Sequence, residues 1–593
     1  MPAPEIPALP AAITRADYLR LARELEAVAD RPRRSLAVLA TFTTDFLKPC
    51  LEVEAERRQL SVEAWLAPYG QIEQQVVDAG SELYSRQHDA VLVLARLEDW
   101  LPDLGPRFVS HTPAALEEVR TGLRERWTSL LQALRSRTSA KVLVGSFVPP
   151  LWCATGLADV SLAPSQASFV QLLNDDLAAV CATLPDVQVL DVARVACETG
   201  LDRWRDERLE YLARAPWSAE ASIAVARATA RRMRPWFIAP KKCLVLDMDN
   251  TLWGGVLGEA GHDGIALGLD YPGNVFMDFQ RRILALHDCG ILLAAASKNN
   301  AADVEAVLEN HSFSLLKRRH FAAFEVHWED KATSLRRIAS TLNIGLDSLV
   351  FFDDNPVERQ WVREQLPMVT VLEVPTTPLG YVRTLADSAC FDLPALTSED
   401  RKRAALYQED AGRKELQQQA GSIEDFLRGL QMTLSIGHVD EATLPRVAQL
   451  LGKTNQFNLT NRRHGAAELQ RMAEDGALVL WARVKDRFGD NGLIAAAVLV
   501  PEGAATWRLD TFLMSCRVIG RGVETALLAV MEKLLHDRGA RLLIGEYLAT
   551  PKNQPAADFL SRHGFNPEGD VWHLSLEHPR PLPDYFILDS SLA

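Results

Sequence analysis

The sequence predicts an α/β protein with three domains. The chain has 593 residues, of which 48 % are hydrophobic, so it can build several cores of the usual domain size. Short apolar runs alternate with helical stretches, which is typical of a parallel sheet covered by helices. We expect domains at residues 35–235, 236–395 and 431–593, with a helical lead-in at 1–34 and a helical connector at 396–430.

In the first domain, residues 36–40 form an apolar run that leads into a polar turn at 41–45. Further strand-like runs alternate with helical stretches: runs at 90–95 and 141–144, helices at 116–134 and 168–183. A basic helix at 219–233 then leads through Pro235 and Pro240 into a new strand. We therefore place the first domain boundary near residue 235.

In the second domain, the apolar runs at 243–246, 291–296 and 348–352 fit buried strands. Each run ends in polar residues, and open α/β sheets bind ligands beyond the carboxyl ends of their strands. These three ends are therefore expected to converge on one crevice. A charged helical stretch at 398–419 follows, and a third unit begins near Gln431, with a strand at 506–514 and a helix at 523–535.

The composition narrows the classes of function. Charged residues make up 24 % of the chain, and no apolar run approaches the roughly 20 residues that cross a bilayer. Residues 1–20 do not resemble a secretory signal. The formal net charge of −14 disfavours nucleic-acid binding, which needs a concentrated basic surface. We expect a soluble, cytoplasmic protein that binds neither a membrane nor a nucleic acid.

The eight cysteines show no CxxC spacing. This argues against a disulfide framework and against a structural zinc site. Most of them are expected to be buried, reduced core residues.

Two aspartates follow the first apolar run of the second domain, in the stretch LVLDMDNT at 244–251. At the end of a strand, Asp247 can attack a phosphorus or acyl centre as a carboxylate nucleophile. Asp249 can protonate the leaving group and later activate water. A charged phosphoryl group repels an anionic nucleophile, so this chemistry needs Mg²⁺, which prefers hard oxygen ligands.

Further polar residues follow the other runs in order. Ser297 can hydrogen-bond phosphoryl oxygens at the start of a helix, where backbone N–H groups also favour an anion. Lys331 can offset developing negative charge. Asp353 and Asp354 complete an acidic metal site, although the sequence does not decide which of them contacts the ion. The alternative interpretation is that these residues are ordinary strand-end caps and salt bridges.

These motifs resemble the FkbH-like family of the haloacid dehalogenase (HAD) superfamily. The runs that carry the resemblance are DMDNTLWGGVLGE at 247–259, ASKN at 296–299, WEDK at 328–331, LNIG at 342–345 and FFDDNPVER at 351–359. The resemblance covers nearly the whole chain. It implies an SGNH-hydrolase-like α/β sandwich first, a HAD Rossmann-like domain without a cap second, and a GNAT-like (acetyltransferase-like) α+β domain last.

The same resemblance implies roles for individual residues. Metal contacts are expected from Asp247, Asp249 (through its backbone carbonyl), Asp353 and Asp354, and the catalytic set is Asp247, Asp249, Ser297 and Lys331. Substrate contacts are expected from Thr251, Trp253, Lys298, Asn299 and Asn355.

Members of this family take the glyceryl group of 1,3-bisphosphoglycerate, remove phosphate and load the acyl group onto an acyl carrier protein for polyketide assembly. The resemblance implies such an activity here, with glyceryl or a related three-carbon acyl group such as lactyl. The stretch between Thr251 and the next helix near Val275 is short, and so is the stretch after Ser297. Neither holds a large cap domain, so the open crevice can admit the phosphopantetheine arm of a carrier protein.

One residue departs from the family pattern. The residue before the second-motif serine is typically Cys, which can accept the acyl group as a thioester, whereas Ala296 stands there in this chain. Four alternatives follow: direct transfer to the carrier thiol, use of another cysteine such as Cys289 near the opposite end of the strand, phosphatase activity alone, or an alteration at Ala296.

The flanking domains carry further signals. In SGNH hydrolases a serine follows the first strand and a late Asp-x-x-His pair activates it, but residues 41–45 contain no serine and residues 206–211 no histidine. A scaffold or carrier-docking role is therefore expected for the first domain.

In the third domain, Arg517, Gly520 and Gly522 form an R-x-x-G-x-G pattern before a helix, where backbone amides can approach a pyrophosphate. With KTNQFNLT at 453–460, DRFGDNG at 486–492 and Lys552-Asn553, the pattern resembles a GNAT domain that holds coenzyme A or a phosphopantetheine arm. The alternatives are that this domain binds the arm, acetylates a substrate, or only packs against the HAD core.

Three functions stay open from the sequence. The first is a phosphatase-coupled acyltransferase that acts on a small phosphorylated substrate and an acyl carrier protein. The second is a Mg²⁺-dependent phosphatase on a small phosphate ester. The third is a non-enzymatic docking scaffold for a megasynthase.

Overall fold

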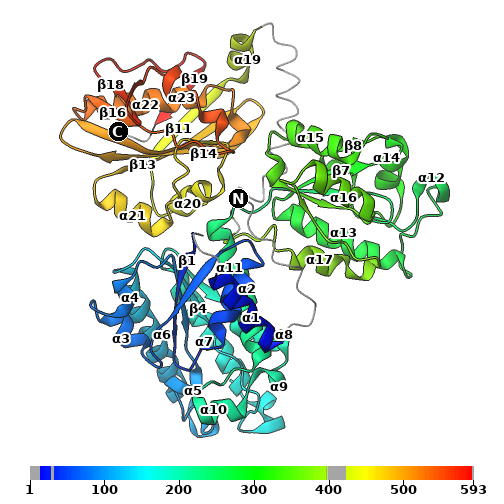
Figure 1. Ribbon diagram of the computed structural model, residues 1–593, viewed down its shortest axis with the longest axis vertical. Coiled ribbons are helices and arrows are strands. Elements are labelled where there is room, and N and C mark those ends of the chain that lie inside the picture. Colours follow the sequence, from blue (N-terminus) through cyan, green and yellow to red (C-terminus); the bar gives the residue numbers. More distant parts are fainter. Residues whose placement is uncertain (1–13, 28–31, 396, 398–421, 591–593) are drawn as a thin grey trace. The chain divides into compact units, whose positions relative to one another are not determined.

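The computed structural model describes residues 14–27, 32–395, 397 and 422–590. Its strands form three sheets (Figure 1). Most of the chain up to Ile238 forms one compact unit, and most of the chain from Ala239 onward forms a second unit that contains two of the sheets. The predicted division of that second unit into a HAD domain and a GNAT-like domain stays a prediction, and the predicted helical stretch at 398–419 lies outside the described residues.

The first sheet is parallel, with the strand order β2-β1-β3-β4-β5. Its strands are β1 (Arg34–Ala40), β2 (Val62–Leu66), β3 (Ala90–Leu94), β4 (Lys141–Gly145) and β5 (Val187–Leu190). The helices are α1 (Arg15–Glu26), α2 (Leu47–Glu56), α3 (Ile72–Val77), α4 (Glu82–Ser85), α5 (Leu97–Trp100), α6 (Pro113–Arg135), α7 (Gln166–Ala182), α8 (Val192–Thr199), α9 (Leu201–Trp204), α10 (Glu207–Ala213) and α11 (Ala219–Phe237).

Both faces of this sheet are buried. Leu36 and Val38 of β1 belong to a core with α2 and α11, and Ala37 and Leu39 belong to a core with α6 and α7. Because successive side chains of a strand point to opposite faces, a continuous apolar run is what such a strand requires.

The helix α11 extends further than predicted. We expected it to end at Met233, but it continues through Pro235 to Phe237. Proline removes one backbone hydrogen bond, and here that loss falls in the last turn, where Ile238 still donates to the carbonyl of Arg234 at 2.8 Å.

The second sheet is also parallel, in the order β10-β9-β6-β7-β8. Its strands are β6 (Cys243–Leu246), β7 (Leu292–Ser297), β8 (Phe321–Val326), β9 (Leu349–Phe352) and β10 (Thr370–Val371). Its helices are α12 (Leu257–Ala260), α13 (Gly273–Asp288), α14 (Ala301–Asn310), α15 (Lys331–Thr341), α16 (Pro356–Gln365) and α17 (Tyr381–Asp387).

The central strand β6 aligns its two neighbours. Leu246 pairs with Phe352 of β9 on one side and with Ala295 of β7 on the other. The three predicted strand ends therefore lie at one edge of the sheet. The sequence did not indicate β8, whose run FAAFEV is only partly buried, or β10, which has two residues.

The third sheet is mainly antiparallel and confirms the predicted α+β class. It contains β11 (Met432–His438), β12 (Phe457–Asn458), β13 (Leu478–Asp486), β14 (Gly489–Pro501), β15 (Thr506–Met514), β16 (Leu542–Gly545), β17 (Asn566–Glu568), β18 (Val571–Ser575) and β19 (Phe586–Ser590). The helices of this part are α19 (Ile423–Leu430), α20 (Leu444–Lys453), α21 (Ala466–Glu474), α22 (Val523–Asp537) and α23 (Phe559–Arg562).

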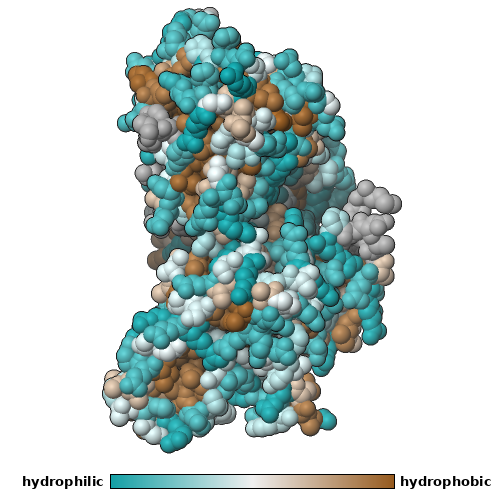
Figure 2. Space-filling model, turned by 90° about the vertical axis from the view of Figure 1, so that its left-hand side faces the viewer, coloured by the Kyte–Doolittle hydropathy of each residue, from teal (hydrophilic) through white to brown (hydrophobic). Residues whose placement is uncertain are grey.

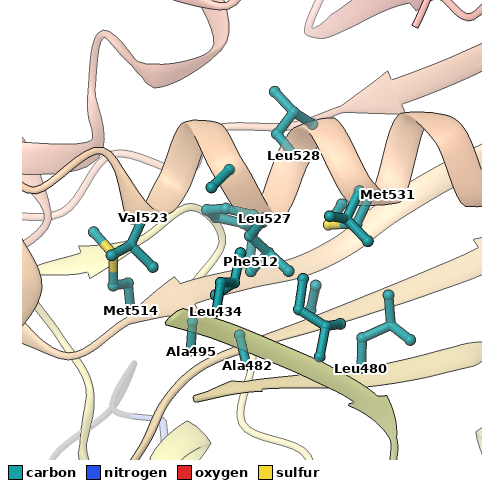
Figure 3. Packing of buried hydrophobic residues seen from close by; sticks show 14 of the residues in the cluster. Leu434, Leu480, Ala482, Ala495, Phe512, Met514, Val523, Leu527, Leu528 and Met531 are labelled. Atoms are coloured by element: carbon teal, nitrogen blue, oxygen red, sulfur yellow. The ribbon is translucent and has the colours of Figure 1, made fainter. Parts of the chain in front are cut away.

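The helix α22 supplies much of the core of this third sheet. Its side chains Val523, Leu527 and Met531 point toward the strands (Figure 3). On the sheet, Leu434 and Phe512 belong to the same buried cluster. The helix is held on the sheet mainly by this apolar contact.

The face drawn in Figure 2 is mostly hydrophilic, with separate hydrophobic patches. Among the described helices, none combines the length and the apolar character needed to cross a bilayer.

We predict that Leu527→Ala lowers the opening free energy of α22 by about 2–5 kcal/mol, because it leaves a cavity in a fully buried core. Native-state hydrogen exchange of the α22 amides measures this change without requiring the whole chain to unfold in one step. The control Leu548→Ala, at a side chain that is 40 % exposed, should change the same amides little. Equal effects of the two variants would contradict this account of the core.

Candidate active site

Asp247 and Asp249 directly follow β6, the central strand of the second sheet. The backbone N–H of Asp247 donates to the carbonyl of Phe352 at 3.1 Å, so the first aspartate still lies in register with the end of β9. The chain then turns at Asn250, which has φ +53°. Asparagine adopts this left-handed conformation more readily than most residues. Its side chain accepts a hydrogen bond from the N–H of Gly255 at 2.8 Å and closes the turn.

Lys331 is the first residue of α15, and its side chain points toward the edge of the sheet where Asp247 lies. The Asp330 side chain caps this helix by accepting from the N–H of Thr333 at 3.0 Å. The Lys331 side chain is 3 % exposed. It donates to a carboxylate oxygen of Asp247 and, at 2.6 Å, to the carbonyl of Ala296. Its Nζ also lies 3.2 Å from Oδ2 of Asp353.

The charges around Lys331 determine its state. Burial acts to lower the pKa of Lys331, but the carboxylates of Asp247 and Asp353 outweigh it, so the pKa is raised. Lys331 is therefore a fixed positive charge beside the first aspartate, as the sequence predicts.

Three carboxylates form a cluster that fits a hard cation. Oxygens of Asp247, Asp353 and Asp354 all lie within 4.8 Å of one another. Burial and, secondly, the charge of Asp247 raise the pKa of Asp353 to about 7 and that of Asp354 to about 6. Oδ2 of Asp353 is buried and accepts no hydrogen bond within the described residues. The three carboxylates carry more negative charge than one lysine balances. Mg²⁺ prefers carboxylate oxygens of this kind as ligands.

Asp353 and Asp354 therefore both lie in the cluster. The sequence did not decide which of the two contacts the ion. Asp353 is held by the N–H of Asn355, which donates to its Oδ1 at 2.8 Å. Asp354 receives a long hydrogen bond of 3.4 Å from the hydroxyl of Thr251. The predicted contact of the Asp249 carbonyl with the metal stays a prediction.

The carboxylate of Asp249 does not belong to this cluster and is held by nitrogen donors. Its Oδ1 accepts from Nε1 of Trp253 at 2.9 Å and from the N–H of Leu257 at 3.1 Å. Its Oδ2 accepts from Nδ2 of Asn299 at 2.9 Å. Burial raises the pKa of Asp249, against these hydrogen bonds, and the charge of Asp247 adds to the increase. A carboxyl with a raised pKa is suited to proton transfer.

Three predicted substrate contacts must be corrected. Thr251 and Trp253 are fully buried and Asn299 is 5 % exposed. Their polar groups face Asp354 and Asp249 rather than the crevice. Because the polar groups of Thr251, Trp253 and Asn299 are already bonded to carboxylates of the site, these residues support the carboxylates.

The other predicted contacts lie nearer the surface. Lys298 forms an ion pair with Glu358 at 2.6 Å. The Asn355 side chain caps α16 by accepting from the N–H of Val357 at 2.9 Å. Ser297 ends β7, and its hydroxyl has no hydrogen-bond partner within the described part of the chain, which leaves it available to a phosphoryl oxygen.

Sequence reasoning missed three residues that position the site. The Arg359 guanidinium donates to the carbonyls of Asp353 and Asp354, both at 2.8 Å. The Tyr381 hydroxyl donates to the carbonyl of Asn250 at 3.0 Å. Gln280 is fully buried and donates to the carbonyl of Leu252 at 2.9 Å. Arg359 is the last residue of the motif FFDDNPVER at 351–359, so its sequence position could have indicated its role. The residues around Gln280 and Tyr381 in the sequence give no indication of their partners.

No thiol stands beside Asp247 in this sheet. Ala296 is fully buried and shares a core with Val245 and Ala332. Cys243 begins β6, Cys289 precedes β7, and the carbonyl of Cys390 accepts from the N–H of Lys241 just before β6. All three cysteines therefore lie at the amino ends of the strands, away from the aspartates.

The crevice has no cap. Between Asp247 and α13 the chain forms one helix of four residues, α12, and only three residues separate β7 from α14. The connections carry the exposed side chains of Trp328, which is 75 % exposed, and Tyr271, and Val357 is exposed in the first turn of α16. The site is thus open at its edge, as the short connections predict.

The glycine pattern of the third sheet has a packing explanation. Gly520 and Gly522 have φ +81° and φ +71°, a region that favours glycine. A Cβ at Gly522 would lie 2.4 Å from the Tyr585 hydroxyl, so the aromatic ring requires a glycine here without any ligand. Nε of Arg517 donates to the hydroxyl of Ser515 at 3.3 Å. The predicted binding of coenzyme A or phosphopantetheine by this loop stays a prediction.

The first sheet carries polar groups at the carboxyl end of β1. The Thr41 hydroxyl donates to Asp99 at 2.6 Å, and Arg96 forms an ion pair with Glu210 at 2.9 Å. Asp206 caps α10 by accepting from the N–H of Leu209 at 2.9 Å. These contacts are structural, and the predicted non-catalytic role of this domain stays a prediction.

Residues 35–140 match the family model of the FkbH N-terminal domain. A search of curated proteins finds no match. Among solved structures, the N-terminal part of a Bacteroides fragilis protein that contains a phosphatase domain complexed with Mg is 28 % identical, with a TM-score of 0.55. The alignment covers 64 % of this chain and 99 % of the other.

Two further matches are much weaker. A Desulfovibrio desulfuricans protein assigned to the GNAT family of acetyltransferases is 20 % identical, with a TM-score of 0.20, and the match covers 24 % of this chain and 99 % of the other. The aminoglycoside 6'-N-acetyltransferase of Enterococcus faecium is 15 % identical, with a TM-score of 0.19 and coverage of 25 % and 98 %.

We predict that Mg²⁺ stabilises the protein through the three-carboxylate cluster. At about one hundred times its Kd the ion should add about 2.7 kcal/mol of stability, seen as a higher thermal midpoint. Asp353→Asn should lose most of this shift because it removes a buried ligand. Glu358→Gln, which changes an acidic residue outside the cluster, should keep it. A full shift in Asp353→Asn would show that the ion binds elsewhere.

Proposed function

We propose that this protein removes phosphate from a small phosphorylated substrate and loads its three-carbon acyl group onto the phosphopantetheine thiol of an acyl carrier protein. The observation that carries the proposal is the convergence of Asp247, Asp353 and Asp354 around Lys331 at an uncapped sheet edge. The match of residues 35–140 and the likeness to a phosphatase-domain protein crystallised with Mg support the same assignment.

The phosphoryl half of the proposed reaction uses the residues of β6. Asp247 attacks phosphorus, the bond from phosphorus to the ester oxygen breaks, and that oxygen takes a proton from Asp249. Water then attacks the aspartyl phosphate and gives its proton to Asp249, which releases phosphate and restores Asp247. Mg²⁺ held by Asp247, Asp353 and Asp354 would neutralise the charge of the phosphoryl oxygens. Lys331 adds a fixed positive charge on the nucleophile's side.

The acyl half needs an acyl phosphate and a thiol. The thiolate of the carrier attacks the acyl carbon, the bond from that carbon to the phosphate oxygen breaks, and phosphate leaves. The absence of a cysteine at the carboxyl ends of the described strands β6–β10 supports direct transfer without an acyl-enzyme. The uncapped edge leaves room for a long arm.

A plain Mg²⁺-dependent phosphatase is the second candidate. It is favoured by Ala296, which offers no acceptor where the family typically has Cys. The two candidates differ in one observable property, the presence of an acyl group on the carrier protein.

We predict that Asp247→Asn lowers phosphate release by at least about 10³-fold, because an amide cannot act as the nucleophile. Phosphate release from 1,3-bisphosphoglycerate with Mg²⁺ measures the effect, and Asp278→Asn on the exposed side of α13 is the matched control. Unchanged phosphate release by Asp247→Asn would remove Asp247 from the mechanism, whereas a wild-type protein without phosphate release would favour the scaffold function.

We predict that wild-type enzyme adds one acyl group to a carrier that bears phosphopantetheine and none to the carrier without it. Intact-protein mass spectrometry of enzyme and carrier after incubation with 1,3-bisphosphoglycerate and Mg²⁺ reports this result. The enzyme itself should stay unmodified. If the carrier stays unmodified with both wild type and Ala296→Cys, acyl loading is wrong and the phosphatase function stands.

A further inference from the structure

The two oxygens of the Asp249 carboxylate have different environments. Oδ1 accepts two hydrogen bonds, from Nε1 of Trp253 at 2.9 Å and from the N–H of Leu257 at 3.1 Å. Oδ2 accepts one, from Nδ2 of Asn299 at 2.9 Å. A carboxylate oxygen has two in-plane acceptor sites. Both sites of Oδ1 are therefore occupied, and one site of Oδ2 is left.

The donors come from two separate connections and are fixed by their own surroundings. Trp253 is fully buried in the core beneath the first connection. The next residue, Gly254, exchanges two backbone hydrogen bonds with Ala266, at 3.0 and 2.8 Å. A Cβ at Gly254 would lie 2.9 Å from the ring of Phe276, so this segment is closely packed.

Asn299 approaches from the connection between β7 and α14. It is 5 % exposed, and its Oδ1 accepts from the N–H of Asn300 at 3.1 Å. Its amide is thereby oriented with the NH₂ group toward Asp249. Rotation of the carboxylate would leave buried donors on both connections without a partner, which costs about 1–3 kcal/mol for each donor.

We infer that Asp249 exchanges its proton through Oδ2, and that Trp253 and Asn299 are positioning residues that aim this oxygen at the leaving group. The inference rests on the proposed phosphoryl transfer. In the first step the proton on Oδ2 passes to the ester oxygen as the bond from phosphorus to that oxygen breaks, and its electron pair stays on the oxygen. In the second step a water proton passes to Oδ2 as the water oxygen bonds to phosphorus and the bond to Asp247 breaks.

The test exploits the dependence of acid catalysis on the leaving group. Phenyl phosphate has a poor leaving group that needs the proton, whereas p-nitrophenyl phosphate has a good one that needs it much less. Trp253→Phe keeps an aromatic side chain, although a smaller one, and removes the N–H, and Asn299→Ala removes the amide. Each variant should lower kcat/KM for phenyl phosphate about 10- to 100-fold more than for p-nitrophenyl phosphate.

The matched control is Trp481→Phe, which loses an indole N–H bond of the same length, 2.9 Å, to the His438 carbonyl in the third sheet. It should leave both substrates unaffected. The Mg²⁺ shift of the thermal midpoint should persist in Trp253→Phe and Asn299→Ala, because neither residue belongs to the metal cluster.

Equal losses for the two substrates, with the Mg²⁺ shift retained, would overturn the inference, because a general loss of structure does not discriminate between leaving groups. Loss of the Mg²⁺ shift in both variants would also overturn it, since the residues would then support the metal cluster instead. Wild-type enzyme without activity on either phosphate ester, or an Asp247→Asn variant with full activity, would instead contradict the proposed function itself.

Discussion

The buried contact of Lys331 with Asp247 and Asp353 is the interaction on which the site depends. Without a positive charge, three carboxylates within 4.8 Å of one another would repel strongly in a setting with little water. One ammonium group offsets part of that charge and leaves the remainder for a cation. The sheet makes this arrangement possible, because β6 has β7 and β9 as neighbours and their carboxyl ends lie in register.

The same edge explains how a phosphatase-like site could serve a large acceptor. The connections that follow β6 and β7 are short, and Trp328, which follows β8, is 75 % exposed. Under the proposed function, the absence of a cap would let the arm of a carrier protein reach the site. Within the described residues, Cys243, Cys289 and Cys390 lie at the amino ends of the strands, so the proposal has the acyl group pass directly to the carrier thiol.

Much of this could be predicted from the sequence because the signals are local. Apolar runs gave the central strands almost to the residue, and polar residues at their ends identified Asp247, Asp249, Lys331 and the acidic pair. The roles of Trp253 and Asn299 could not be derived in this way. Their partners depend on how separate connections meet in space, and a polar residue beside a motif looks the same in sequence whether it faces a ligand or a buried carboxylate.

The other differences between prediction and structure arise where the sequence pattern is weak or where the structure departs from it. The short edge strand β10 has two residues and lacks a pattern that could be recognised. Pro235 suggested a helix end, yet α11 continues past it because the last turn tolerates one missing hydrogen bond. Gly522 fits a phosphate loop in sequence, but the ring of Tyr585 against it gives the glycine a structural reason. Only the Gly522 case is a tertiary contact that overrides a local pattern.

The most direct test of the central claim is to identify the residue that carries the phosphoryl group. Enzyme quenched with acid during turnover of p-nitrophenyl phosphate and Mg²⁺ can be reduced with borohydride, which converts an aspartyl phosphate to homoserine, and the peptides sequenced by mass spectrometry. The account predicts homoserine at Asp247 and at no other aspartate. Homoserine at Asp249 or Asp353, with Asp247 intact, would contradict it.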